Sequence, residues 1–256
     1  MSESELSERE QELKEQFIDS VGYWIDAYDQ WLQLNPDSFE VYANFAAHPW
    51  DKGALSDRER ALILVALDGC ATHLYQEGMR FHIRNALEVG ASVEEVMEAL
   101  ELVSVAGLHS MIEGMPVVQE EAGLPEDVSE SVKDEQQAVK EKFKEGRGYW
   151  SDFWEAVLQM DHEYLDKYTD LSSHPWNEGV LEPKLKEFIY IAADVSTTHL
   201  YTPGLQSHVQ NAMNYGATRD ELLEVVELVS EQGYDTMVEG LPILVDEARK
   251  QGKLPE

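Results

Sequence analysis

Two histidines and two arginines are concentrated in the segment ATHLYQEGMRFHIRNALEVG, residues 71–90, and these residue types could carry acid–base chemistry. Arg80 and Arg84 flank His82 at two residues on either side, and His73 lies nine residues before it. Nearby positive charge lowers the pKa of an imidazole and favours the neutral form, which can accept a proton. Guanidinium groups bind carboxylates through paired hydrogen bonds. The segment predicts that His82 is an acid or base and that His73 assists, and if the substrate is a carboxylate, the arginines are the groups that would bind it.

The chain repeats itself once, with a constant separation of 126 residues between matching segments. A fixed offset of this length indicates a tandem duplication. Gly, Pro and acidic residues interrupt the apolar pattern at residues 121–130, so we place the first repeat at 1–125 and the second at 126–256. The matching segments are GYW at 22–24 and 148–150, HPW at 48–50 and 174–176, THLY at 72–75 and 198–201, and ELVS at 101–104 and 227–230.

The two repeats differ in charge at the predicted site. His199 and His208 occupy the positions of the two histidines in the second repeat and are further candidate catalytic residues. Gln206 and Gln210 replace the two arginines, and an amide cannot bind a carboxylate as a guanidinium does. If the substrate is a carboxylate, we therefore expect the first repeat to be the better catalyst and the second to be structural or differently selective.

The elements that must position these residues are predicted to be helices, because apolar residues recur at helical spacing and no alternating strand pattern is present. We expect one helix over residues 7–33 and another over about 77–89 that ends at Gly90. A later helix is expected to run unbroken through VMEALELVSVAGLHSMI. The predicted fold is all-α. Capping boxes mark three helix starts, at Ser56 with Glu59, Ser92 with Glu95, and Thr218 with Glu221.

The composition restricts the class of partner. The chain has 51 acidic and 19 basic residues, a net charge of −32, so nucleic acids and anionic membrane surfaces are poor partners. Charge of this size suggests a high-salt, halophilic cytoplasm in which counterions screen the repulsion. Cys70 is the single cysteine, which is typical of a reducing compartment, and neither a signal peptide nor a membrane-spanning run is evident. We expect a cytoplasmic protein that acts on a small molecule.

The segments LSDRERALILVAL, MRFHIRNALEVGAS and VEEVMEALELVSVAG together resemble the carboxymuconolactone decarboxylase family, whose relatives include the alkylhydroperoxidase D-like proteins. The resemblance covers most of residues 17–120 and 143–246. It implies an all-helical fold, an active site in the cleft around the family histidine, and assembly into a homo-oligomer, here a trimer of two-repeat chains.

The cysteines distinguish the two branches of this resemblance. The peroxidase branch carries a Cys-x-x-Cys pair before its histidine, and by alignment the first of those cysteines falls on His73 and His199 of this chain. Thiol peroxidase activity is therefore not expected. The resemblance instead implies a lyase that removes a carboxylate from a small lactone acid by histidine acid–base chemistry. The alternative is a metal- or ligand-binding member without decarboxylase activity.

Other residues support or compete with this interpretation. Tyr75 and Tyr201 follow the THL segments and are candidates for lining the substrate cleft. Glu187 matches a proton-relay glutamate of the peroxidase branch, but we expect an ordinary exposed helix glutamate there rather than a relay. We expect no cofactor, but two histidines and a glutamate per repeat have the composition of a two-His-one-carboxylate metal site. The possible metal ligands are His73, His82 and Glu113 in the first repeat, and His199, His208 and Glu239 in the second.

Overall fold

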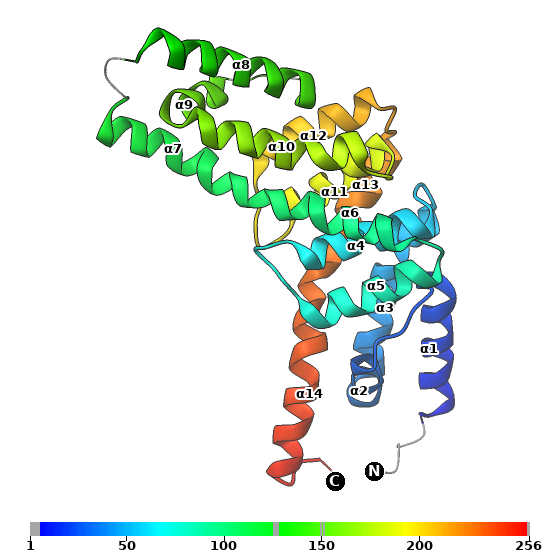
Figure 1. The fold of residues 1–256 in the computed structure, drawn as a ribbon. Coiled ribbons are helices and arrows are strands. Elements are labelled where there is room, and N and C mark those ends of the chain that lie inside the picture. Colours follow the sequence, from blue (N-terminus) through cyan, green and yellow to red (C-terminus); the bar gives the residue numbers. More distant parts are fainter. Residues whose placement is uncertain (1–5, 125–127, 149, 151, 255–256) are drawn as a thin grey trace.

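The computed structural model describes residues 6–124, 128–148, 150 and 152–254, and all regular elements in these ranges are helices (Figure 1). The all-α prediction is confirmed. Within the same ranges, no helix is both long and apolar enough to cross a bilayer. The first repeat comprises α1 (Glu8–Val21), α2 (Ala27–Leu34), α3 (Pro36–Lys52), α4 (Asp57–Gly69), α5 (Gln76–Glu88), α6 (Val93–Ser104), the short 3-10 helix η1 (Val105–Leu108) and α7 (His109–Ala122).

The second repeat has the same order of elements. The predicted junction includes residues 125–127, which lie outside the described residues, so the exact division at 125 and 126 stays a prediction. The elements are α8 (Glu130–Arg147), α9 (Asp152–Met160), α10 (His162–Glu178), α11 (Pro183–Val195), α12 (Thr202–Asn214), α13 (Arg219–Ser230), the 3-10 helix η2 (Glu231–Tyr234) and α14 (Asp235–Lys250).

Local sequence signals account for several helix boundaries. The hydroxyls of Ser56, Ser92 and Thr218 accept a hydrogen bond from the backbone N–H three residues later, and the glutamate at that position bonds back. These reciprocal bonds satisfy donors that a helix start otherwise leaves unpaired. Gly90 follows α5 with a φ of +95°, a left-handed conformation that costs glycine little. The three predicted capping boxes are confirmed.

Two predicted helices are broken in the structure. The helix expected over residues 7–33 divides at Gly22, whose φ of +81° ends α1 before α2 begins at Ala27. The helix expected through VMEALELVSVAGLHSMI divides into α6, η1 and α7, so that His109 becomes the first residue of α7. This second break redirects the chain and brings the start of α7 against the other repeat.

The two repeats share one apolar core rather than forming separate bodies. Buried side chains of α4, α5 and α6 pack in the same cluster as those of α11, α12 and α13. Thr72 and Thr198, which are equivalent residues, contact each other through their hydroxyl oxygens at 3.4 Å. Contact between equivalent residues places a pseudo-twofold axis between the two loops.

The last helix of each repeat packs on the first helices of the other repeat. Figure 1 shows α7 extending along the side where α8, α9 and α10 lie, and α14 extending along α2. Leu241 of α14 is buried in the aromatic cluster that includes Phe17 and Trp31, and Leu108 before α7 is buried with Phe143 and Trp154. The repeats are therefore interlocked.

Buried charges join the repeats at equivalent positions. Glu224 of α13 accepts a hydrogen bond of 2.6 Å from Arg60 of α4, and its other oxygen accepts from the backbone N–H of Ala54 and Leu55. In the equivalent contact Glu98 of α6 pairs with Lys186 of α11 at 2.8 Å and accepts from Val180 and Leu181. Each glutamate is at most 3% exposed, so both ion pairs are fully desolvated.

Replacing Glu224 with Ala should destabilise the whole chain by about 3–5 kcal/mol, because two N–H groups lose their acceptor and the buried Arg60 guanidinium keeps only the exposed Asp57 as a partner. Urea denaturation followed by circular dichroism measures this loss. The control is Glu130→Ala, which removes an exposed ion pair with Lys133 and should change the free energy of unfolding by less than about 0.5 kcal/mol. Equal losses in the two variants would contradict this role for the buried pair.

Candidate functional site

A left-handed turn after α4 and α11 positions the histidines of both THLY segments. Leu74 and Leu200 have φ values of 47° and 51°, which cost a non-glycine residue about 1–2 kcal/mol. The turn returns the chain, so that the N–H of Tyr75 donates to the carbonyl of Asp68 at 3.0 Å. His73 therefore lies in this loop, beside the end of α4.

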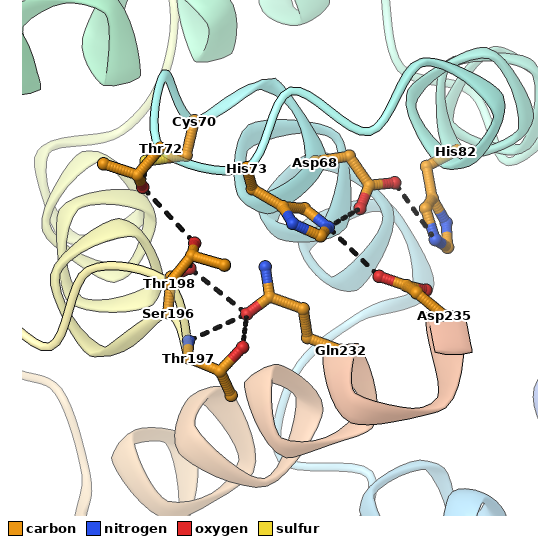
Figure 2. A network of polar contacts seen from close by, with 10 residues as sticks. All are labelled: Asp68, Cys70, Thr72, His73, His82, Ser196, Thr197, Thr198, Gln232 and Asp235. Carbon is orange, nitrogen blue, oxygen red and sulfur yellow. Dashed lines mark hydrogen bonds and ion pairs between the residues drawn. The ribbon is translucent and has the colours of Figure 1, made fainter. Parts of the chain in front are cut away.

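In the first repeat, Asp68 lies between the two predicted histidines (Figure 2). Its oxygens lie 3.9 Å from Nε2 of His73 and 3.7 Å from Nε2 of His82. His73 Nε2 also lies 3.0 Å from Oδ2 of Asp235, the first residue of α14. The first-repeat cluster is thus completed by a residue from the second repeat.

The second-repeat cluster has the same arrangement with different residue types. Asp194 lies 3.9 Å from Nε2 of His208 and 3.8 Å from Nε2 of His109, which is the first residue of α7. His109 Nδ1 and His199 Nε2 are 2.6 Å apart and share a hydrogen bond. Glu187 adds a partner that the first repeat lacks, because its Oε2 lies 2.6 Å from Nδ1 of His208.

Burial shifts the pKa values of the acidic and imidazole groups in opposite directions. Burial, with a smaller contribution from Asp235, raises the pKa of Asp68 to about 8, and burial raises the pKa of Asp194 to about 7. Burial lowers the pKa of His82 to about 4, and it lowers the pKa of His109 to about 4 with help from His199. The low pKa predicted for His82 therefore comes from burial rather than from the flanking arginines.

The two clusters face hollows of very different size. A larger hollow of about 860 Å³ adjoins the second-repeat cluster, whereas the smaller hollow beside the first-repeat cluster measures about 40 Å³ and is lined by Tyr23, Tyr28 and Tyr42. Tyr149, the counterpart of Tyr23, lies outside the described residues. Polar residues lining the larger hollow include His109, Arg147, Asp194, Gln206, His208 and Gln210, and the aromatic ones include Trp154, Tyr168, Tyr190 and Tyr201.

Several predicted site residues lie away from both hollows. Arg80 and Arg84 are exposed on α5 and line neither hollow, so their positions do not support a role in binding substrate. The guanidinium that does line the larger hollow is Arg147, at the end of α8. Glu113 and Glu239 are also exposed, and neither belongs to a cluster that could hold a metal.

The remaining predicted residues are divided between the sites. Tyr201 lines the larger hollow and stacks on His109 with ring centroids 3.9 Å apart, while Tyr75 packs beside His73 at 5.7 Å. Glu187 is 2% exposed and contacts His208, so the prediction that it is an exposed helix glutamate is wrong.

Comparison with known proteins identifies the family of the chain. The sequence model of the carboxymuconolactone decarboxylase family matches residues 36–119 and 162–243, more than half of the chain. The chain belongs to the carboxymuconolactone decarboxylase family. It is also similar to the crystal structure of a candidate gamma-carboxymuconolactone decarboxylase subunit from Burkholderia xenovorans, with a TM-score of 0.87 and 38% identity over 96% of this chain and 100% of that one. Comparison with curated proteins finds no match.

The family resemblance did not reveal all of the residues that make the clusters. Asp68 and Asp194 directly follow the apolar runs ALILVAL and FIYIAA at equivalent positions, and an acid at the end of such a run was a signal available in the sequence. His109 and Asp235 are equivalent but differ in type, so comparison of the repeats could not identify them as a pair. Arg147 has Val21 as its counterpart and gave no repeat signal.

Gly204 should be required for the position of Asp194 in this member of the family. A Cβ atom added to Gly204 would lie 2.2 Å from Oδ2 of Asp194, so Gly204→Ala should cost about 1–3 kcal/mol of stability by overpacking. The matched control is Gly240→Ala in α14, where a Cβ meets nothing within 4 Å and a gain of up to about 1 kcal/mol is expected. Thermal denaturation of the two variants tests the difference, and a stabilised Gly204→Ala protein would contradict the close approach.

The raised pKa of Asp68 predicts a pH-dependent stability. The folded chain retains a proton on this carboxyl that the unfolded chain loses above its ordinary pKa of 3.8, so the stabilisation is lost as pH rises toward about 8. Asp68→Asn cannot titrate. Its stability relative to the parent should therefore increase by about 1–3 kcal/mol between about pH 5 and about pH 8 in urea denaturation. In the control Asp51→Asn, at an exposed position, the free energy of unfolding relative to the parent should be the same at both pH values. A relative stability of Asp68→Asn that does not change with pH would contradict the raised pKa of Asp68.

Proposed function

We propose that this family member is a lyase that removes a carboxylate from a small lactone acid in the larger hollow, with His208 as the acid–base group. The observation that carries the proposal is the convergence of Arg147, His208 and Asp194 on one hollow of about 860 Å³. A guanidinium that seats a carboxylate and a group that delivers a proton to carbon are the two functions that such a reaction needs.

His208 is oriented for proton transfer by two neighbours. Glu187 accepts a hydrogen bond from Nδ1 when that nitrogen carries a proton, which fixes the ring and leaves Nε2 for the substrate. The ring of Tyr190 stacks against His208 with centroids 4.5 Å apart and restrains it further. Nε2 then lies on the side of Asp194, whose carboxyl has a pKa of about 7 and can exchange a proton near neutral pH.

The proposed step consumes one proton, which His208 supplies and then recovers from solvent. The bond between the lactone ring carbon and its carboxylate breaks, carbon dioxide leaves, and the electron pair enters the conjugated ring system as an enolate. Side-chain amides of Gln206 and Gln210 line the hollow and are candidate donors to the enolate oxygen. Protonated His208 then gives its Nε2 proton to the ring carbon, and Arg147 holds the second carboxylate of the substrate.

This proposal moves catalysis to the second repeat, whereas the sequence favoured the first. Arg80 and Arg84 carried that earlier expectation, and both lie away from the hollows. The smaller hollow of about 40 Å³ leaves room for little more than a water molecule beside His82. We therefore assign the first-repeat cluster a structural role in the proposed enzyme.

Turnover of carboxymuconolactone, measured as the release of carbon dioxide, tests the assignment. His208→Ala and Glu187→Gln should lower kcat by about 100-fold or more, as expected for loss of general acid–base catalysis, while His82→Ala retains most of the activity. Arg147→Met should mainly raise KM. Full activity in His208→Ala, or loss of activity only in His82→Ala, would overturn the proposal, and circular dichroism of each variant establishes that the fold is retained.

A further inference from the structure

We propose that His109, Asp194 and His199 form a binding site for one divalent transition-metal ion, a site that requires residues from both repeats. His109 begins α7 of the first repeat, whereas Asp194 ends the apolar part of α11 and His199 lies in the turn that follows it. The carboxylate expected from the sequence, Glu239, is exposed and distant from this group, so the site uses a different acid.

The distances suit a tetrahedral ion after small movements. One ligand atom from each of the three residues lies within 4.8 Å of the others, and His109 Nε2 is 3.8 Å from Asp194 Oδ1. Bonds of about 2.0–2.2 Å at tetrahedral angles place ligand atoms roughly 3.3–3.6 Å apart. The contact with Asp194 uses Nε2 of His109, whereas the hydrogen bond of 2.6 Å to His199 uses Nδ1, so that hydrogen bond breaks and the His199 ring turns toward the ion when it binds.

The alternative is an imidazole pair that shares one proton beside a neutral Asp194. That arrangement accounts for the hydrogen bond between the rings but leaves Oδ2 of Asp194 buried without a hydrogen-bond partner among the described residues. A bound cation would stabilise Asp194 as a carboxylate and bring a positive charge to its buried oxygens, which the sharing of a proton between the rings does not.

Comparison of the repeats supports ligand function at these positions. Asp68, His73 and Asp235 are the equivalents of the three residues, and they also converge within 4.8 Å. Both repeats therefore keep metal-ligand residue types at all three positions, although Ala61 has become Glu187 and Arg80 has become Gln206 nearby. The second-repeat set has two imidazoles and favours zinc or iron, whereas the first-repeat set has two carboxylates.

The sizes of the two hollows indicate which of the two ligand sets binds the ion. His109 and Asp194 line the larger hollow, so an ion bound there has an entry path and space for water or substrate as a fourth ligand. Asp68 and Asp235 line only the smaller hollow of about 40 Å³. Tyr201 stacks on His109 and fixes its ring from the side of the larger hollow. We therefore assign the ion to the second-repeat cluster alone.

The test measures zinc binding directly, so it is independent of the lyase proposal. The full-length chain without a polyhistidine tag is treated with chelator, and Zn²⁺ is titrated calorimetrically in excess Mg²⁺, which occupies oxygen-rich surface sites. We expect one Zn²⁺ per chain and a higher Tm in its presence. His109→Ala and His199→Ala should each weaken binding by about 100-fold.

Matched variants separate this site from other binding. His174→Ala removes an exposed histidine, with 62% of its side chain accessible, and should leave the affinity unchanged. Asp235→Asn alters the first-repeat cluster and should also leave one Zn²⁺ per chain. His199→Gln, a polar replacement in the exposed turn, provides a second test if His109→Ala fails to fold. No stoichiometric binding, or binding that survives both His199 replacements, would overturn the proposal.

Discussion

The exchange of buried charge between the repeats is the constraint on which the rest of the structure depends. Glu98 and Glu224 each pair with a cation near the start of a helix of the other repeat, which is α11 for Glu98 and α4 for Glu224. Each glutamate also accepts hydrogen bonds from two backbone N–H groups that precede that helix. A buried charge without a partner in that position lowers the stability of the fold far more than an apolar side chain there would. The register of α6 against α11, and of α13 against α4, is therefore fixed, and this register sets where α7 and α14 begin.

The starting points of α7 and α14 determine the composition of both clusters. Because η1 and η2 turn the chain, the first residue of α7, His109, lies beside Asp194 of the second repeat. In the same way the first residue of α14, Asp235, lies beside His73 of the first repeat. The backbone arrangement is the same in both places, but the side chains around it differ. Tyrosines fill the space beside Asp68, whereas space remains beside Asp194, so one scaffold presents a closed and an open version of the same polar group.

Much of the fold followed from the sequence because its signals are local. The capping boxes, the all-α class and the duplication depend on residues close together or at one fixed offset. The contacts that complete the clusters instead join His109 to His199 across 90 residues and His73 to Asp235 across 162, and no local pattern identifies these partners. The charge of Arg80 and Arg84 was visible in the sequence, but the direction of their side chains on α5 was not, because both faces of that helix carry polar residues.

The location of His109 and Asp235 has an evolutionary consequence. In a symmetric pair of identical chains, any substitution in the first residue of that helix would appear in both sites at once. Covalent fusion removes this restriction, because each position is encoded separately. One site can then acquire an imidazole while the other keeps an acid. A substitution that changes the chemistry of one site does not have to be compatible with the other.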